Sequence, residues 1–509
     1  MPHALTELKV HTVTKPVGTT SHQLDADFCV VGAGVSGISA AIESARLGRD
    51  VVLVDGLPVL GGQMMNSLIG LFCGVYGNGP AYRQLTHGIF DGIFADLGAS
   101  GDLHVNRGHT ITVTYDEVAL GRWVERRIRE LGVRVVLGAS LTGVERDGRR
   151  ITAVSFATRH GAVRVTAPGF VDATGDAALT WEAGLPCRIP DRTIYGSQQI
   201  VLEHLDEEHQ PSREELAERV HANAAEWGLI RRDGLAFFFP GRNTAVLNMT
   251  HIPAPLDPVE ASSAQLEGRE QADRVVEFLR AEFPKAFGAA KVRSYGFPGR
   301  RQTRWIKGVH QLSLEEVRTG IRFDDAVART SWPIELHDRA DGYVWETFDA
   351  DHVHYVPLRS LLSPDCDNLI AAGRCADGDA AALSSVRVMG PCAGQRRHHQ
   401  HRGHLLSDGD PRQRRCLGVL GRQDRRHGRS LARRRHPRRR SRSARSVHRV
   451  RGLPGRDGAG AVRARPGPAQ AAGRGGGRTV RGGTRDRRDA GEDGSPLLTG
   501  GSVPDVIRR

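Results

Sequence analysis

The feature that most constrains this chain is a glycine-rich loop between a short apolar run and an alanine-rich stretch near the N-terminus. The run Phe28-Cys29-Val30-Val31 is typical of a buried parallel strand, and it leads directly into Gly32-Ala33-Gly34-Val35-Ser36-Gly37. Residues 38–47 have helical apolar spacing, and Gly48 follows where a left-handed cap is expected. A second apolar run, residues 51–54, ends in Asp55. The order of strand, glycine loop, helix and strand predicts a βαβ unit.

Each glycine of this loop has a mechanical role in binding a dinucleotide. Gly32 permits the tight turn, Gly34 lets the backbone approach a pyrophosphate, and Gly37 lets the helix pack on the strand. The helix N-terminus then faces the phosphates, and Asp55 emerges where a carboxylate can accept hydrogen bonds from a ribose diol. A glycine turn without a ligand is the alternative, but the complete βαβ register favours dinucleotide binding.

Further segments predict a larger domain around this unit. Residues 116–131 have the pattern of an amphipathic helix, and a strand is expected at 133–137. Turn residues separate three apolar runs that predict a β-meander, at 141–146, 151–158 and 163–166. Two later apolar runs break into glycine, at 170–176 and 368–374. The predicted fold class is α/β, with a Rossmann-like domain that contains a parallel sheet and a β-meander, and with an inserted α+β substrate domain.

With these segments in place, the sequence resembles the FAD-dependent oxidoreductases of the fumarate-reductase-like, glutathione-reductase-type superfamily, especially the group related to the flavin subunit of heterodisulfide reductase. The matching segments, in the family's order, are residues 32–37, 60–63, 171–176, 299–325, 355–362 and 369–392. The resemblance implies FAD as the cofactor, which the glycine loop alone does not distinguish from NAD. It does not identify the substrate.

The resemblance also places the cofactor on individual residues. It implies that the first loop binds the pyrophosphate, that Asp55 binds the adenosine ribose, and that Gly61 and Gly62 form a loop at the flavin. Gly175-Asp176 would meet the ribityl-pyrophosphate side, and two C-terminal segments would run along the isoalloxazine. The predicted cofactor-binding residues are Gly32, Ala33, Gly34, Ser36, Gly37, Asp55, Gly61, Gly62, Gly175, Asp176, Gly373, Arg374, Ser385 and Val386.

The chain between the two parts of this domain is assigned to an inserted substrate domain. Capping boxes at Ser212-x-x-Glu215 and Ser313-x-x-Glu316 mark helices there. A second dinucleotide fingerprint and a redox Cys-x-x-Cys are both missing from the sequence, which argues against a pyridine-nucleotide disulfide reductase. The predicted boundaries are a flexible N-terminal segment at 1–26, the FAD-binding domain at 27–178 and 356–395, the inserted domain at 179–355, and a tail at 396–509.

Two short segments of the inserted domain carry the candidate catalytic groups. Arg301 and Arg304, in a segment that resembles the family's arginine motif, suit binding a carboxylate or lying over the flavin, although a solvated basic loop is the alternative. His337 suits acid-base catalysis near neutrality, although a single histidine is more often structural. The predicted function is hydride transfer between a small organic substrate and N5 of the flavin, and the alternative is a non-catalytic or defective flavoprotein. Weaker candidates are His310, His352, His354 and Tyr355.

The tail has a composition unlike the rest of the chain. Residues 396–509 contain 31 arginines, no lysine and nine acidic residues, a net charge of +22, which leaves a net charge of −9 for residues 1–395. The tail lacks aromatic residues, so we expect it to be disordered. Arginine without lysine is typical of a GC-rich gene read out of frame, and we hypothesise a frameshift near codon 393 that also removes a helix closing the flavin site. A basic arm that binds nucleic acid is the alternative.

The remaining features predict a cytoplasmic enzyme with reduced thiols. The seven cysteines lack the spacing of thiolate metal sites, and no run approaches the roughly 20 apolar residues needed to cross a bilayer. The N-terminal residues also lack the apolar core of a signal peptide. We expect a small-molecule substrate and no metal, membrane or nucleic-acid contact. The electron partner and the oligomeric state are left unspecified.

Overall fold

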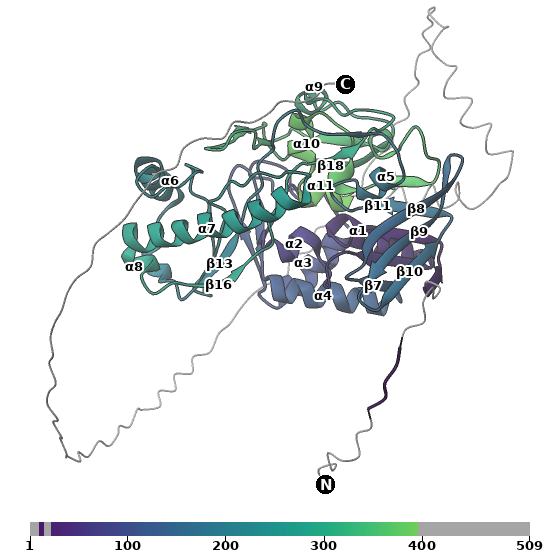
Figure 1. Ribbon diagram of the computed structural model, residues 1–509. Helices are drawn as coiled ribbons and strands as arrows, with labels where there is room; N and C mark the ends of the chain where they lie inside the picture. The colour runs from purple at the N-terminus through teal and green to yellow at the C-terminus, as the bar shows by residue number, and fades with distance from the viewer. Residues whose placement is uncertain (1–9, 15–21, 395–509) are drawn as a thin grey trace, which may run out of the picture. The chain divides into compact units, whose positions relative to one another are not determined.

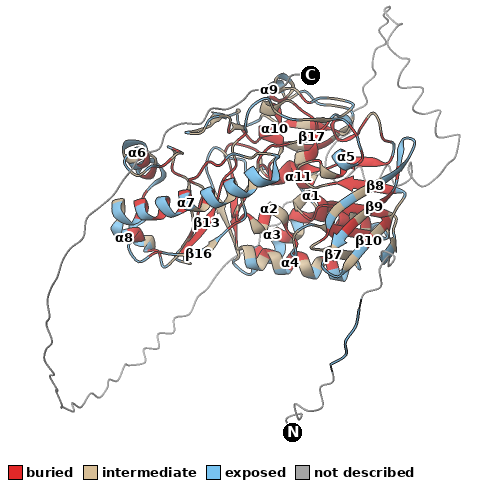
Figure 2. Cartoon of the chain, viewed as in Figure 1, coloured by how far each residue is buried: buried red, intermediate tan, exposed pale blue. Residues whose placement is uncertain are grey.

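The glycine loop lies at the end of a five-stranded sheet in which every neighbouring pair of strands is parallel (Figure 1). The computed structural model describes residues 10–14 and 22–394. The inner strands are buried on both faces, as expected for a parallel sheet covered on each side (Figure 2). The sheet order is β22 (Leu369–Ala371), β11 (Gly169–Asp172), β2 (Phe28–Val31), β3 (Val51–Asp55) and β7 (Arg134–Leu137).

Helices cover one face of this sheet. Val30 and Leu53 point toward them and pack in one core cluster with Ile38 and Trp123. The longest of these helices starts at Asp116, whose side chain accepts a hydrogen bond from the Ala119 amide at 2.8 Å, so the predicted helix at 116–131 is confirmed. The helices of this layer are α1 (Val35–Arg46), α2 (Gly62–Asn66), α3 (Ile89–Ala99) and α4 (Glu117–Glu130).

The predicted β-meander covers the other face. Cys29, Val52 and Val54, which alternate with the helix-facing residues, pack against Val154 and Phe156 of the meander. Its strands are β8 (Ser140–Asp147), β9 (Arg150–Thr158) and β10 (Gly161–Thr166), and β1 (His22–Asp25) pairs in parallel with β10. The segment 1–26, predicted as flexible, therefore includes a strand. The predicted α/β fold class is confirmed.

A second hydrophobic core lies between an antiparallel sheet and a long helix. The helix begins at Asp257, which accepts hydrogen bonds from the amides of Val259 and Glu260, both at 2.9 Å, and Val275 and Leu279 pack on the sheet. The sheet order is β14 (Ala236–Phe239), β15 (Thr244–Leu247), β13 (Ile200–Glu203) and β16 (Lys291–Tyr295). The helices of this region are α6 (Arg213–Asn223), α7 (Pro258–Glu282) and α8 (Pro284–Phe287).

Shorter elements connect these two cores. Both predicted capping boxes form, at the starts of α6 and of α9 (Leu314–Thr319). The other α-helices of the described residues are α5 (Ala178–Glu182), α10 (Ala380–Val386) and α11 (Met389–Gly394). The remaining paired strands are β4 (Leu71–Phe72) and β5 (Leu103–Asn106) with β6 (Thr112–Tyr115), β12 (Cys187–Arg188) with β17 (Trp305–Ile306), β18 (Ala326–Thr330) with β21 (His354–Pro357), and β19 (Ile334–Leu336) with β20 (Val344–Glu346).

The domain boundaries at 178/179 and 355/356 stay predictions. Within residues 10–14 and 22–394, no helix combines the length and the apolar character that crossing a bilayer requires. The expected disorder of residues 396–509 concerns residues outside the described part of the chain.

Candidate active site

The first glycine loop is packed against the backbone that directly follows the neighbouring strand β11. Gly32 has φ +103°, and a Cβ there would overlap the carbonyl oxygen of Ala173. Gly34 is different, because a Cβ there would meet no heavy atom within 4 Å. The loop is therefore tightly packed behind Gly32 and open in front of Gly34.

The N-terminus of α1 opens onto this same space. Gly34 is the N-cap residue, no side chain caps the helix, and its first turn contains no acidic residue. The amides at the start of such a helix are free to bind a phosphate. An open cradle in front of an uncapped helix is the arrangement that a dinucleotide pyrophosphate requires, so these residues fit FAD.

The second glycine segment lies directly on the first loop. The Gly61 amide donates to the carbonyl oxygen of Ala33 at 2.9 Å, and a Cβ on Gly62 would lie 2.7 Å from Cα of Gly34. The structure therefore brings together two predicted segments of the cofactor site.

Asp55 has a structural contact that the sequence did not predict. Its carboxylate accepts hydrogen bonds from the amides of Ala33 at 2.5 Å and of Leu57 at 2.8 Å. Burial raises the pKa of Asp55 above its usual value, and these two hydrogen bonds oppose that rise. Asp55 thus holds the glycine loop in place, and the predicted ribose contact would use its remaining acceptor positions.

Asp176 joins three segments that lie far apart in the sequence. Its carboxylate accepts a hydrogen bond from the hydroxyl of Thr303 at 2.5 Å, and it lies 3.4 Å from Arg374 and 3.6 Å from Arg300. Burial alone would raise the pKa of Asp176, but Arg374, Thr303 and Arg300 together hold it below its usual value. Nε of Arg304 donates to the backbone carbonyl of Asp176 at 3.0 Å. The Gly-Asp motif, the arginine segment and Gly373-Arg374 therefore form one cluster.

The last predicted cofactor residues have buried side chains that contact protein. Ser36 lies so close to Gly373 that a Cβ at Gly373 would overlap its hydroxyl oxygen. The hydroxyl of Ser385 donates to the carbonyl oxygen of Trp332 at 2.6 Å and lies 2.7 Å from Nε2 of His354. Val386 belongs to a hydrophobic cluster. Because these side chains contact protein, the flavin contacts predicted for these residues would have to be made by their backbone atoms.

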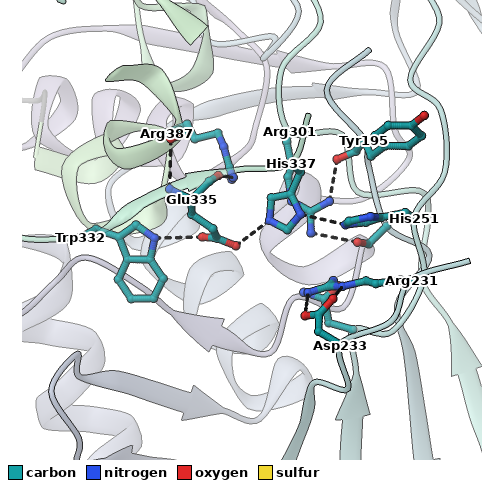
Figure 3. Close-up of polar contacts among 12 residues, drawn as sticks. Tyr195, Arg231, Asp233, His251, Arg301, Trp332, Glu335, His337 and Arg387 are labelled. Atoms are coloured by element: carbon teal, nitrogen blue, oxygen red, sulfur yellow. Dashed lines mark hydrogen bonds and ion pairs between the residues drawn. The ribbon is translucent and has the colours of Figure 1, made fainter. Parts of the chain in front are cut away.

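The two arginines predicted as catalytic point to different places. Arg304 lies over the Trp181 ring, with 4.6 Å between the guanidinium carbon and the ring centroid. Arg301 is buried, and it donates to the carbonyl oxygen of Tyr195 at 2.7 Å and to the hydroxyl of Ser197 at 2.9 Å (Figure 3). Among the described residues, no carboxylate lies within 4 Å of its guanidinium. Burial, followed by the charges of Arg387 and Arg231, lowers the pKa of Arg301 to about 9.

His337 belongs to a buried polar chain next to Arg301 (Figure 3). Its Nε2 lies 2.9 Å from Oε1 of Glu335, and its Nδ1 lies 2.8 Å from Nε2 of His251. Oε2 of Glu335 accepts a hydrogen bond from the Trp332 indole at 3.0 Å. Burial, with the charges of Arg301, Arg231 and Arg387, holds the pKa of His337 well below its usual value. The structure therefore places Arg301 and His337 in one region and Arg304 at the Asp176 cluster.

Three residues of this buried region were missed in the sequence. Glu335 stands two positions before His337, a spacing that places two strand residues on one face and that was the only signal available. His251 follows strand β15 and Arg231 precedes strand β14, both in the second core. Nothing in the sequence linked either residue to His337. Of the weaker candidates, His310 pairs with Glu316 at 3.1 Å, and His352 contacts His354 at 3.1 Å.

The chain belongs to the family described as FAD dependent oxidoreductase, whose model matches residues 27–395. Membership in this family confirms the predicted cofactor, FAD. A protein named probable fumarate reductase Ifc3, from Shewanella frigidimarina (strain NCIMB 400), is 28% identical over 169 residues. The match covers 32% of this chain, and the chain spans about a quarter (25%) of the length of that relative.

Two solved structures show a more distant likeness. A geranylgeranyl bacteriochlorophyll reductase-like protein from Thermoplasma acidophilum is 13% identical, with a TM-score of 0.40 over 79% of this chain and 84% of that chain. The flavin-dependent brominase Bmp2 is 11% identical, with a TM-score of 0.43 over 76% of this chain and 80% of that chain.

Proposed function

We propose that this oxidoreductase transfers a hydride between a small organic anion and N5 of FAD. Bound FAD supplies the two-electron chemistry, and the protein binds and orients the substrate and exchanges a proton with it. The observation that carries the proposal is Arg301, a buried guanidinium with no carboxylate within 4 Å among the described residues, next to the His337 chain. An anion at Arg301 would compensate a charge that the protein leaves uncompensated.

The proposed roles follow from these positions. A guanidinium has five N–H donors, so Arg301 can keep its contacts to Tyr195 and Ser197 and still donate to a carboxylate. His337 and the groups hydrogen-bonded to it are proposed to carry the proton. Arg304 is proposed for the flavin side of the site, because it contacts the Asp176 carbonyl. The proposal also includes the predicted FAD contacts. These are made by the glycine loops, Asp55, Asp176, Arg374 and the segment around Ser385.

The relative named a fumarate reductase makes fumarate the first probe. Enzyme reconstituted with FAD is reduced with dithionite without oxygen, excess reductant is removed, and fumarate is added while the flavin absorption is followed. Dimethyl fumarate is the matched control, because it keeps the double bond and removes both charges. Fumarate is expected to reoxidise the flavin, and a panel of hydroxy and amino acids tests the reverse direction with oxidised enzyme.

Arg301→Gln tests the role of the guanidinium. Losing hydrogen bonds to a charged group costs about 1.5–3 kcal/mol, so the KM for the anion should rise roughly 10- to 200-fold. Arg318→Gln, at an exposed ion pair with Glu346, is the control. Neutral substrates that react while every anion fails, or a KM that Arg301→Gln leaves unchanged, would exclude this proposal.

The other open questions have separate tests. A flavoprotein with no catalytic role would show no flavin reduction or reoxidation with any donor or acceptor. A tail that binds nucleic acid would shift labelled DNA in a salt-sensitive way that deletion of residues 396–509 abolishes. The family match ends at residue 395, which supports the proposed frameshift near codon 393, and a single clean reading frame in the resequenced gene would exclude it. A cytoplasmic location remains part of the proposal.

A further inference from the structure

A line of four polar contacts runs through the buried region around His337. It begins at the carbonyl oxygen of Ala340, 2.8 Å from Nδ1 of His251, and continues through the 2.8 Å contact between His251 and His337. It then passes through the 2.9 Å contact to Glu335 and ends at the indole of Trp332, 3.0 Å from Glu335. Each contact is short enough to need one proton between its two atoms.

The two ends of this line fix where the protons lie. A carbonyl oxygen only accepts, so Nδ1 of His251 carries a proton and its Nε2 accepts when the ring is neutral. Nδ1 of His337 must then donate to His251, which leaves Nε2 of a neutral His337 as an acceptor. An ionised Glu335 is also an acceptor, so the 2.9 Å contact between them would lack a proton. One additional proton is therefore held between Glu335 and His337.

Exposure decides which group can pass this proton on. The His337 side chain is 0% exposed and both ring nitrogens are engaged, whereas the Glu335 side chain is 16% exposed. The backbone on either side of this carboxyl is held in place, because Ser384 accepts a hydrogen bond from the Glu335 amide at 3.1 Å and Arg387 donates to its carbonyl oxygen at 3.0 Å. Both partners belong to the segment 369–392, which carries predicted flavin contacts.

We propose that Glu335 is the catalytic acid-base residue of this site, and that His337 and His251 are positioning residues that keep a proton available to it. The assignment rests on the proposed hydride transfer and moves the proton-exchanging role from His337 to Glu335. Reduction of a C=C bond would require a hydride at one carbon, and bound FAD would supply it together with its two electrons. The other carbon forms a C–H bond with the proton of Glu335, whose O–H bond breaks and leaves a carboxylate.

Charged and titratable groups face the contact between Glu335 and His337 from several elements. Arg301, Arg231 and Arg387 lie nearby, and Asp233 is engaged by Arg231 through two contacts of 2.6 Å. Tyr343 stacks on His337 at 4.6 Å between ring centroids, Cys73 lies near Glu335, and Asp338 pairs with Arg192 at 2.9 Å. Burial, followed by the charges of these three arginines, holds the pKa of His337 well below its usual value, which disfavours a cationic ring at this contact.

The first test needs no substrate. Protein labelled with ¹⁵N-histidine is titrated by NMR, and His337→Gln assigns the signals. His337 is expected to carry its proton on Nδ1 throughout, with a strong hydrogen bond at Nε2. Glu335→Gln keeps the shape and lets an amide N–H donate to Nε2 of a neutral His337, so the fold and this tautomer should persist while the additional proton is lost. A His337 with an unprotonated Nδ1 in the wild type overturns the proposal.

The second test separates binding from proton transfer. Glu335→Gln should leave the Kd of fumarate, or of any anion that the wild type turns over, within about twofold. The reason is that Arg301 and Arg387, which have no ion-pair partner among the described residues, both remain. The rate should fall about 10²- to 10⁴-fold, and the pH dependence of the remaining rate should disappear. Glu346→Gln, on the neighbouring strand β20 and paired with Arg318, is the matched control. A wild-type rate in Glu335→Gln would overturn the assignment even if the substrate class is correct.

His251 has its own diagnostic. His251→Ala removes the acceptor for Nδ1–H of His337 and frees its tautomer, so the pH profile should shift. His251→Gln offers one acceptor and one donor in similar positions, and it should restore the wild-type profile at least in part. A pH profile that neither variant changes would show that His251 has only a structural role.

Discussion

Alanine substitutions at two glycines of the first loop, Gly34 and Gly32, can separate cofactor binding from protein stability. Gly34 has φ −75° and ψ −176°, which any residue adopts, and a Cβ there would meet open space. Gly32 has φ +103° and is packed against the carbonyl of Ala173. Gly34→Ala should therefore weaken FAD binding without affecting folding, and Gly32→Ala should destabilise the fold.

The expected magnitudes follow from opposing terms. Gly34→Ala loses a favourable N-cap, at about 0.5–1 kcal/mol, and gains about 0.4–1 kcal/mol from a stiffer unfolded chain, so the apoprotein should change by less than about 1 kcal/mol. Its methyl group would stand between the α1 amides and the pyrophosphate. Losing one charge-assisted hydrogen bond costs about 1.5–3 kcal/mol, which raises the Kd for FAD roughly 10- to 200-fold. Gly32→Ala adds backbone strain of about 1–3 kcal/mol and an overlap of similar cost.

Two measurements on the apoproteins check these values. Urea unfolding gives the free energy of unfolding, and quenching of FAD fluorescence on titration gives the Kd. Gly48→Ala, also at positive φ but with no heavy atom within 4 Å of its Cβ position, isolates the cost of backbone strain from overlap. Wild-type FAD affinity in Gly34→Ala would refute the assignment of the open cradle to the pyrophosphate.

Three further predictions follow from the charges of the site and the buried thiols. The pKa of Asp176 is lowered in the folded state, so its ion pairs stabilise the protein at any pH above the unfolded-state pKa of about 3.9. This stabilisation is lost as the pH falls through the folded-state pKa. Urea unfolding should show that Asp176→Asn is about 1–3 kcal/mol less stable than the wild type at pH 7, and that its stability depends less on acid pH. Fumarate should bind more tightly than the monoanion crotonate, by about tenfold or more in Kd measured from the flavin spectrum, because its second carboxylate can compensate Arg387 as well as Arg301. Equal affinities would argue against a second arginine at the anion site. Burial raises the pKa of Cys29 and of Cys392 to about 12, so mass spectrometry should find neither thiol alkylated by iodoacetamide at pH 8 until the protein is unfolded.

The parallel sheet was predictable because its signals are local. Four consecutive apolar residues before a glycine loop define β2, and the apolar runs at 51–54, 133–137 and 170–172 define its neighbours. The sheet order was not predictable in this way, since β22 pairs with β11 across about 200 residues of chain. The strand β1 was missed because His22–Asp25 has little apolar character and is held by backbone pairing with β10.

The candidate cofactor site leaves a stronger signal in the sequence than the proposed proton-transfer site, for a physical reason. Binding a pyrophosphate requires glycine at fixed spacings, so Gly32, Gly34 and Gly37 carry the signal within six residues. A buried proton chain requires only that donors and acceptors meet in space. His251 and Glu335 are 84 positions apart, and no spacing rule joins them. The fold brings them together through the loops that follow β15 and surround β19.

The charges around Arg301 connect substrate binding to the proposed proton transfer. Arg231 is compensated by Asp233, whereas Arg301 and Arg387 have no ion-pair partner among the described residues, and Nε of Arg387 lacks even a hydrogen-bond partner. In the proposed reaction Glu335 enters as the neutral acid, and these groups would then carry two positive charges, which a dicarboxylate would compensate. Once Glu335 gives up its proton, only one positive charge remains for a product that still carries two negative charges. In the proposed reaction, the same proton transfer that completes the reduction would therefore weaken the binding of the product.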